Sequence, residues 1–406
     1  MDPDSIRKAI NFEEFIEKVR PIVEDVRLNG DEAVLKYERL FDNVELHRLR
    51  VKKKEIDSAY EAVDDELIDA LELARENIER FHILTTVERE IKIQFEDCFM
   101  GKIYKPLERV GAYIPGGRAS YPSTALMTGI PANIAGVEKI IACTPPDSNG
   151  KVNPLTLVAC DIAGFDEIYS VGGAQAIAAM AYGTESIPKV QKIVGPGNAY
   201  VTAAKLIVSK DVAIDMPAGP SEILIIADDS ANAEFIAYDC LAQLEHDPLA
   251  VAVVLTTSEK IANEVKRIVY EKIAEPNLAL KIVKDVDEAI KISNEFAPEH
   301  LSIFCRNAEK YLAKVKNAGS VFLGDFSGVA MGDYAAGTNH VLPTLGYAKI
   351  YSGLTVESFM KSITFQQLTP ETIKRLGNAV VKLAEAEGLK YHAESIKIRL
   401  NYSKKS

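Results

Sequence analysis

The stretch Met331–Pro343 brings together three side-chain types that carry out chemistry in enzymes. It contains a carboxylate (Asp333), an amide (Asn339) and an imidazole (His340), separated by glycines and closed by a proline. Glycine lets the backbone come close to a ligand, and binding residues are often carried on such loops. Asp, Asn and Gly are also common in ordinary turns, so this segment alone fits a surface loop equally well.

The histidines elsewhere in the chain strengthen the case for a site. Four of the six have a carboxylate or an amide close by in the sequence. An imidazole that binds a metal or moves a proton needs such a neighbour, because a hydrogen bond fixes its tautomer and orientation. For His47 and His82 we expect ordinary, partly exposed residues at the ends of helical segments. The four candidates are His246 near Gln243, His300 beside Glu299, His340 beside Asn339 and His392 near Glu387.

Gln243 and His246 could share one metal ion. They are three positions apart at the end of an expected helix, Ala231–Glu245, so they would project from the same face. With Asp333 and His392 they would offer two nitrogens and two oxygens, which suits Zn, Mn or Co in an open site. Taken alone, the pair is better explained as polar residues at the exposed end of a helix.

Glu299 and His300 come just before an expected buried strand, Leu301–Cys305. Ligands of parallel sheets bind at the carboxyl ends of strands, so this position weakens a catalytic assignment. Adjacent side chains in extended backbone point opposite ways, and we therefore expect two separate jobs, a general base and a group that orients water. No Ser or Cys occupies a nucleophile-elbow motif, so the sequence makes no positive case for covalent catalysis.

Composition narrows the partners and the compartment. The chain of 406 residues has room for two or three domains, and its net charge of −12 argues against nucleic-acid and anionic-membrane partners. The one dense basic run, Arg48–Lys54, is short, and we expect it to be a solvated approach to a strand or helix. No apolar run approaches the ~18 residues of a membrane span and the N-terminus lacks secretory features, so we expect a cytoplasmic protein. The five widely spaced cysteines indicate reduced, mostly buried thiols.

Short apolar runs alternate with helical stretches after residue 138, which is typical of parallel strands joined by crossover helices. Two sets of such runs predict an α/β fold with two parallel sheets. The first set is Lys139–Cys143, Glu167–Val171, Lys192–Val194 and Asp211–Ile214, and the second is Ala250–Leu255, Leu280–Val283, Leu301–Cys305 and Ser320–Leu323.

The flanking segments have different patterns. Apolar residues at steps of three and four predict one long helix over Lys54–Phe81, and Ile91–Tyr113 predicts two or three short strands. Near the C-terminus, Thr369 caps a helix that begins with a proline and has Gly388 past its end, and a second short helix carries His392. Such a tail packs either on its own subunit or on a partner, and the sequence leaves both open.

Three glycine turns come after expected strands within one unit, at Gly111–Gly117, Gly172–Gly173 and Gly195–Gly197. Helix N-termini after such turns offer free N–H groups, so together the turns favour a face that binds a phosphorylated ligand. The last turn departs from the dinucleotide fingerprint, because Tyr200 occupies the third glycine position and a proline separates the first two. Each turn alone is weak evidence.

Seven motifs in this order resemble the histidinol dehydrogenase family over nearly the whole chain. That family oxidises L-histidinol to L-histidine in two NAD-dependent steps through the aldehyde, as a homodimer with one zinc per site. Its incomplete Rossmann pair accounts for the missing fingerprint. The motifs are Gly111-Ala-Tyr-Ile-Pro-Gly-Gly117, Val171-Gly-Gly-Ala-Gln175-Ala-Ile, Val194-Gly-Pro-Gly-Asn198, Pro217-Ala-Gly-Pro-Ser221-Glu222, Gln243-Leu-Glu-His246, Phe296-Ala-Pro-Glu-His300-Leu and Gly332-Asp-Tyr-Ala-Ala-Gly-Thr-Asn-His340-Val-Leu-Pro-Thr344.

The resemblance implies roles for individual residues. His300 would be the general base, and Glu299 would activate water for the second oxidation. The implied zinc ligands, which also position the substrate, are Gln243, His246, Asp333 and, from the neighbouring subunit, His392. The implied further substrate contacts are Ser221, His300, His340 and Glu387, and the implied NAD contacts are Tyr113, Gln175 and Asn198.

We therefore predict two incomplete Rossmann-like parallel-sheet domains with small helical extensions at both ends. The expected parts are a helical extension (1–25), a first α/β domain with the metal and catalytic residues (26–108 and 230–352), a second on the NAD side (109–229) and a helical tail (353–406). An alternative function uses the same metal ligands in a metal-dependent hydrolase, whose glycine turns would bind a small phosphorylated or amide substrate.

Overall fold

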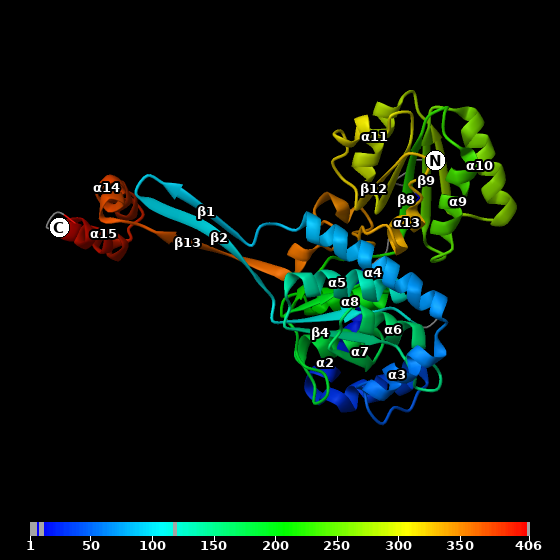
Figure 1. The fold of residues 1–406 in the computed structure, drawn as a ribbon, viewed down its shortest axis with the longest axis horizontal. Coiled ribbons are helices and arrows are strands. Elements are labelled where there is room, and N and C mark those ends of the chain that lie inside the picture. Colours follow the sequence, from blue (N-terminus) through cyan, green and yellow to red (C-terminus); the bar gives the residue numbers. More distant parts are fainter. Residues whose placement is uncertain (1–5, 8–11, 117–119, 404–406) are drawn as a thin grey trace. The chain divides into compact units, whose positions relative to one another are not determined.

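The fold contains two parallel sheets of five strands each, and helices surround each sheet (Figure 1). This computed structural model describes residues 6–7, 12–116 and 120–403. In chain order, the strands of each sheet are arranged three-two-one-four-five, so the direction of winding reverses between the first and the fourth strand. This is the doubly wound Rossmann arrangement without its sixth strand, and it confirms the predicted pair of incomplete Rossmann-like domains.

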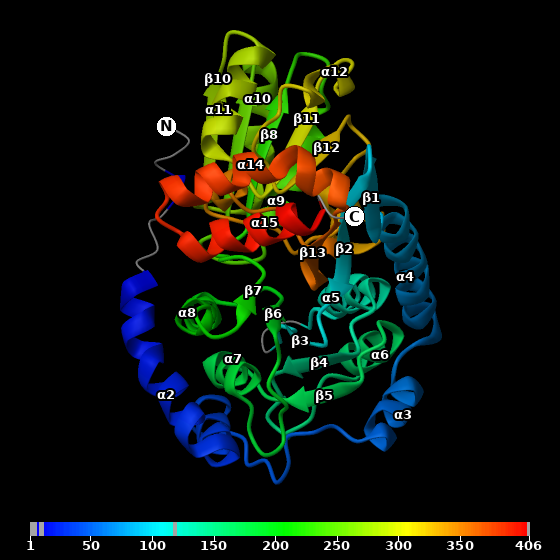
Figure 2. The same ribbon diagram turned by 90° about the vertical axis from the view of Figure 1, so that its left-hand side faces the viewer.

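The first sheet has the order β5-β4-β3-β6-β7 and is covered by helices on both faces (Figure 2). Helices α5 and α6 pack together on one face, and α7 and α8 pack together on the other. The strands are β3 (Arg109–Tyr113), β4 (Lys139–Thr144), β5 (Glu167–Ser170), β6 (Lys192–Val194) and β7 (Ala213–Ile214), and the helices are α5 (Pro122–Ala135), α6 (Pro154–Ile162), α7 (Gly173–Tyr182) and α8 (Ala199–Val208).

The second sheet has the order β10-β9-β8-β11-β12. Leu224 and Ile226 of its central strand belong to one apolar core, with α11, whereas Ile223 and Ile225 belong to another, with α9 and α10. Burial on both faces explains why its strands read as continuous apolar runs. The elements are β8 (Glu222–Ala227), α9 (Ala233–Leu244), β9 (Val251–Thr256), α10 (Glu259–Lys272), β10 (Leu278–Ile282), α11 (Val286–Phe296), β11 (His300–Phe304), α12 (Glu309–Leu312), β12 (Ser320–Leu323) and α13 (Val329–Tyr334), followed by the short helices η2 (Tyr347–Lys349) and η3 (Val356–Phe359).

The structure corrects two of the expected domain boundaries. The sequence places residues up to 229 with the first sheet, yet β8 is the central strand of the second sheet. It places residues 26–86 with the second sheet, yet α2 (Phe12–Tyr37) packs against α7 and α8, and the following helices pack against α5 and α6. Both errors have one cause, since contacts between segments far apart in the chain leave no local pattern.

The expected single helix over Lys54–Phe81 is two helices, α3 (Lys53–Ala62) and α4 (Asp65–Thr85). Asp64 separates them, because its side chain accepts a hydrogen bond from the Glu66 N–H and caps the start of α4. His82, in the last turn of α4, is only 1 % exposed, so the expectation of a partly exposed residue is wrong.

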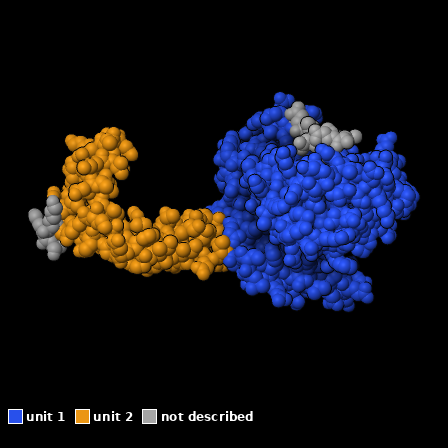
Figure 3. Space-filling model, turned by 90° about the horizontal axis from the view of Figure 1, so that it is seen from above, with its two compact units in different colours: residues 1–86, 107–359 blue, residues 87–106, 360–406 orange. Residues whose placement is uncertain are grey.

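Residues 87–106 and 360–406 form a second compact unit (Figure 3). In it β2 (Cys98–Pro106) pairs antiparallel with both β1 (Glu90–Phe95) and β13 (Met360–Gln367). Helices α14 (Pro370–Ala386) and α15 (Lys390–Ser403) pack against each other, and Thr369 caps α14 as predicted. The tail is therefore not wholly helical, and residues 87–106 belong with it rather than with the first α/β domain.

Two expectations from composition can be compared with the structure. All five cysteines are buried and free, as predicted. Among the residues that the structure describes, no helix combines the length and the apolar character that crossing a bilayer requires.

A buried carboxylate ties the short helix η1 (Glu38–Asp42) to the first sheet. Glu38 is fully buried, and its Oε1 accepts hydrogen bonds from the Gly172 N–H (3.0 Å) and from Nε2 of Gln175 (2.9 Å). Burial raises the pKa of Glu38 to about 7, even though both hydrogen bonds favour the ionised form. Its other oxygen, Oε2, has no hydrogen-bond partner among the described residues.

We expect Glu38→Gln to flatten the dependence of stability on pH. The folded-state pKa of about 7 lies above the ordinary value of 4.5. The folded chain therefore binds the proton more tightly, and its stability falls as the pH rises from the unfolded to the folded pKa. The shift corresponds to roughly 3 kcal/mol. Urea unfolding from about pH 4.5 to about pH 8 should show wild type losing stability relative to the variant.

The control for this comparison is Glu13→Gln, which neutralises an exposed carboxylate on α2. Its stability should follow that of wild type at every pH. Parallel curves for wild type and Glu38→Gln would mean that Glu38 does not titrate in this range.

Candidate active site

Glu299 and His300 lie where β11 begins, in the interior of the second sheet. β11 pairs with β8 on one side and with β12 on the other, and its pairing starts at His300. The Glu299 Oε2 accepts a hydrogen bond from the Glu222 N–H (2.9 Å) at the start of β8. Both side chains are buried. Ligands of doubly wound sheets usually bind at the carboxyl edge, so this cluster occupies the opposite edge.

Arg7 neutralises the Glu222 carboxylate beside this hydrogen bond. Its Nη2 lies 2.7 Å from Glu222 Oε1, and its Nε donates to Oε2 at 2.8 Å. The guanidinium also lies 3.5 Å from the centre of the Phe296 ring. This bidentate ion pair stabilises the charged form of a carboxylate that burial would otherwise destabilise. The effect of burial still dominates, because the pKa of Glu222 is raised.

His300 lies between two carboxylates. Its Nδ1 is 3.6 Å from Glu299 Oε2, and its Nε2 is 3.3 Å from Asp333 Oδ1. Burial disfavours the charged imidazole, but the two carboxylates outweigh burial and raise the pKa of His300 to about 9. Burial also raises the pKa of Glu299 to about 8. Neither ring nitrogen meets strict hydrogen-bond geometry with a described residue, although Nδ1 faces the Glu299 carboxylate and Nε2 faces the Asp333 carboxylate.

The sequence predicts that Glu299 and His300 point to opposite sides, and this prediction is wrong. Their side chains approach to 3.6 Å and share one buried site. Glu299 precedes the first paired residue of β11, so the alternation of side chains along a strand does not extend to it.

His340 is fixed in one tautomer. Its Nδ1 lies 2.7 Å from the backbone oxygen of Asp333, and because a carbonyl only accepts, Nδ1 must carry the proton. Nε2, 3.2 Å from the Thr124 hydroxyl, is then the acceptor. Burial lowers the pKa of His340, in keeping with a neutral ring. Burial would raise the pKa of Asp333, but the nearby His300, His340 and His246 outweigh it and lower that pKa.

Gln243 and His246 come from the end of α9. The helix ends at Leu244, so Gln243 is buried in its last turn, whereas His246 lies beyond the end and is exposed. The chain still turns beyond the helix end, because the His246 N–H bonds to the Gln243 carbonyl (3.4 Å). α13, which carries Asp333, packs against α9. Within the described residues, no group of three or more His, Cys, Asp or Glu side chains could hold a metal ion.

The site uses three residues that sequence reasoning did not single out for chemistry, namely Glu222, Thr124 and Asp239. Burial and the nearby Asp333 raise the pKa of Asp239 to about 6. Its Oδ2 has no hydrogen-bond partner in the described part of the chain. The sequence held two signals that could have identified two of these residues: Asp239 lies within the apolar segment of α9, and Glu222 directly precedes the apolar run of β8. Ser221, an expected substrate contact, directly precedes Glu222 and is half-buried.

Tyr113, Gln175 and Asn198 lie at the carboxyl edge of the first sheet. Tyr113 ends β3, and its hydroxyl accepts a hydrogen bond from the Gly173 N–H (3.1 Å). Gln175 lies in the first turn of α7, with its Oε1 buried and without a partner among the described residues. Asn198 caps α8 by accepting from the N–H groups of the first turn. The three surround the β3–β6 reversal, where doubly wound sheets bind their ligands.

Gly195 is required at this reversal. Its φ of +105° is rarely adopted by other residues, and a Cβ would lie 2.2 Å from the Tyr113 backbone oxygen. The turn after β6 thus packs directly on the end of β3. Gly117, from the motif that follows β3, lies outside the described residues.

Glu387 and His392 belong to the second compact unit. Glu387 is the C-cap residue of α14, and His392 is in the first turn of α15. Both side chains are exposed.

Comparison with known proteins assigns the family. Residues 5–400 match the family model described as histidinol dehydrogenase. The chain is 67% identical over 395 residues to a histidinol dehydrogenase of Archaeoglobus fulgidus, covering 97% of this chain and 98% of that protein. It is 50% identical to one of Methanocaldococcus jannaschii, covering 97% of this chain and 94% of that protein.

A solved structure agrees with these sequence matches. The crystal structure of histidinol dehydrogenase from Elizabethkingia anophelis superposes with a TM-score of 0.93 at 43% identity, covering 97% of this chain and 93% of that chain. Sequence and fold thus match along the same nearly complete length, and the chain belongs to the histidinol dehydrogenase family of oxidoreductase enzymes.

Proposed function

We propose that this enzyme oxidises L-histidinol to L-histidine through L-histidinaldehyde, transferring two hydrides to NAD, the last steps of histidine biosynthesis. The observation that carries the proposal is the buried cluster of Glu299, His300 and Asp333, which joins two proton-exchanging groups in one place. Its occurrence in a chain 67% identical to a protein named histidinol dehydrogenase points to this substrate.

We assign the metal site to Gln243, His246 and Asp333, completed by His392 of the neighbouring subunit in a homodimer. Nitrogen and oxygen donors without thiolate suit zinc, or Mn or Co, in a site open to substrate. Gln243, His246 and Asp333 supply three of the four donors of a tetrahedral site, and His392 of the neighbouring subunit would supply the fourth. The metal, when bound, would hold and orient the substrate and polarise it.

We assign NAD to the carboxyl edge of the first sheet. Gln175 presents an unpartnered buried oxygen there, and the N-termini of α7 and α8 offer positive potential to the phosphates. Tyr113 and Asn198 would contact the cofactor from the ends of the neighbouring strands. NAD, when bound, accepts the hydride in each oxidation.

The proton transfers fall to two adjacent residues. His300 takes the hydroxyl proton of the alcohol in the first oxidation and then releases it to solvent. Glu299 takes a proton from water, so that the resulting hydroxide adds to the aldehyde, and the deprotonated His300 takes the hydroxyl proton of the hydrate in the second oxidation. Asp333 is one cause of the high pKa of His300. A cation held by Asp333 would weaken that cause and bring His300 nearer to the neutral form that a base needs.

The remaining substrate contacts come from three parts of the chain. Ser221 precedes β8 beside the cluster, and His340 donates to the Asp333 backbone. Glu387 would be supplied by the neighbouring subunit together with His392.

The reaction itself can be observed directly. We expect the protein with L-histidinol and NAD to form two NADH per substrate, measured by absorbance. Hydrolysis of a phosphorylated or amide substrate without NADH would instead favour the metal-dependent hydrolase.

Glu299→Gln should separate the two half-reactions. The amide cannot accept a proton from water, so aldehyde oxidation should slow by about 100-fold or more, whereas alcohol oxidation should continue. Stopped-flow NADH formation from histidinol and from histidinaldehyde measures each step. Glu295→Gln, at an exposed position on α11, is the control and should leave both rates unchanged. An equal loss of both rates in Glu299→Gln would contradict the assignment.

Mixed dimers can test whether the tail acts on the partner. His246→Ala and His392→Ala should each be inactive as homodimers. Co-expressed, they form heterodimers with one intact site if His392 serves the neighbouring subunit, restoring about a quarter of wild-type activity. If the tail serves its own subunit, every site lacks one ligand and the mixture stays inactive.

A further inference from the structure

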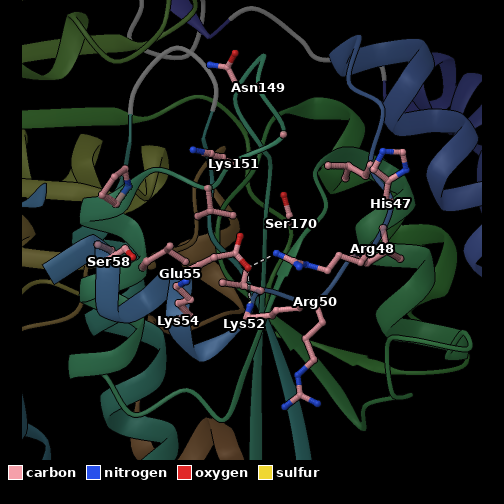
Figure 4. A pocket seen from close by; sticks show the side chains of 18 of the residues that line it. His47, Arg48, Arg50, Lys52, Lys54, Glu55, Ser58, Asn149, Lys151 and Ser170 are labelled. Carbon is pink, nitrogen blue, oxygen red and sulfur yellow. Dashed lines mark hydrogen bonds and ion pairs between the residues drawn. The ribbon is translucent and has the colours of Figure 1, made fainter. Parts of the chain in front are cut away.

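A cavity of about 810 Å³ lies beside β5, the edge strand of the first sheet (Figure 4). Its lining residues come from three segments. Some lie between residues 45 and 62, before and within α3, and others lie between residues 149 and 157, before and within α6. The last is Ser170, at the end of β5. Its volume is within the range of small-molecule sites. None of the residues assigned above to substrate, metal or NAD lines it.

Cationic side chains dominate this cavity. Five Lys and Arg residues and His47 line it, against the two carboxylates Glu45 and Glu55. This local excess of positive side chains contrasts with the net charge of −12 of the whole chain. Like charges held together repel unless an anion compensates them. The five are Arg48, Arg50, Lys52, Lys54 and Lys151.

The two arginines are held in place by carboxylates. Arg48 pairs with Glu55. Arg50 lies 2.9 Å from Glu167 Oε1, but Lys139 lies 2.8 Å from the same oxygen. One carboxylate thus serves two cations, so positive charge remains at this side of the cavity.

The three lysines are free to meet an anion. Lys52, Lys54 and Lys151 form no ion pair with any residue that the structure describes, and all three side chains are exposed. The loop that carries Lys151 is ordered by Asp147, whose Oδ1 accepts the Lys151 N–H at 2.9 Å. Figure 4 shows Lys52, which precedes α3, Lys54 of α3 and Lys151 of this loop among the side chains that line the cavity.

The buried lining carries one polar group without a partner. Ser170 is 6 % exposed and lines the cavity, and its Oγ has no hydrogen-bond partner within the described residues. A buried hydroxyl left in this state is unfavourable, because it has lost its hydrogen bonds to water without replacement. A molecule bound in the cavity could accept or donate the missing hydrogen bond. The other buried lining residues are apolar, namely Leu49, Ala59, Val152 and Leu157.

We propose that this cavity binds a phosphorylated small molecule of nucleotide size. Its phosphates meet Lys52, Lys54 and Lys151, and its less polar part lies on the apolar lining and hydrogen-bonds to Ser170. α3 and α6 both begin at the cavity, where the Glu55 carboxylate accepts the Lys52 N–H (2.9 Å) at the start of α3 and Asn153 caps α6. The basic run Arg48–Lys54, which the sequence indicates to be merely solvated, is in this view one wall of a binding site.

Uridine diphosphate is a suitable probe, because it has two phosphates but not the adenine of NAD. Calorimetry on the full-length protein in saturating NAD should show binding that weakens as salt is added. Absence of binding at millimolar probe would overturn the proposal. So would displacement by NAD, which would place the probe in the dinucleotide site. Oxidation of histidinol is not part of this assay, so its outcome is independent of the function proposed above.

Two triple variants separate a site from general attraction. Lys52→Gln with Lys54→Gln and Lys151→Gln should weaken uridine diphosphate binding by about tenfold or more. The matched control, with Lys260→Gln, Lys266→Gln and Lys272→Gln on the exposed side of α10, removes the same charge and should bind like wild type. Equal weakening in both variants would overturn the proposal.

Ser170→Ala tests the buried end of the site. The substitution removes an unpartnered hydroxyl, so the melting temperature of the free protein should not fall. Binding of uridine diphosphate should weaken several-fold. An unchanged affinity would mean that the bound molecule does not reach Ser170 and would overturn this placement.

Discussion

The hydrogen bond from the Glu222 N–H to the Glu299 carboxylate is the contact on which the buried cluster of Glu299, His300 and Asp333, to which we assign catalysis, depends. It joins the starts of β8 and β11, where the winding of the second sheet reverses, and so holds Glu299 within 3.6 Å of His300. A buried carboxylate, a buried imidazole and Asp333 then share one low-dielectric place, where each charge strongly affects the protonation of the others. Arg7 makes this arrangement possible by compensating Glu222.

The residues that we assign to NAD and to catalysis lie at opposite edges of their respective sheets. The first sheet presents Tyr113, Gln175 and Asn198 at its carboxyl edge, as expected for a doubly wound fold. The second sheet uses its amino edge for Glu299 and His300. Both sheets belong to one compact unit, and two hydrogen bonds join α5 to the loop after α13. The Thr124 hydroxyl lies 3.2 Å from His340 Nε2, and the Asn339 amide donates to the Met127 carbonyl (2.7 Å).

Hydrogen-bonding groups without partners mark both regions to which we assign ligands. Among the described residues, they are the two nitrogens of His300 in the cluster that we assign to catalysis, and the Oε1 of Gln175 at the edge that we assign to NAD. Ser170 has the same character in the basic cavity. A folded chain satisfies most of its buried polar groups, so these positions are where a bound molecule would remove an energetic cost. His82 Nε2 is also buried without a partner but lies in no site that we assign. A missing partner therefore indicates a ligand site only where the surrounding charge and the shape of a cavity point to a ligand as well.

Local patterns in the sequence were enough to predict the fold class, most strands of both sheets and the residue types of the motif that we assign to catalysis. These patterns are continuous apolar runs, glycine turns and polar residues beside histidines. Three further facts could be read only from the folded chain: β8 is the central strand of the second sheet, β2 pairs with β13, and Glu299 and His300 approach each other. The tertiary structure also decided that Arg48–Lys54, Lys151 and Ser170 line one cavity. Each of these facts depends on contacts between segments distant in the chain, whose geometry is set by packing and leaves no periodic trace in the sequence.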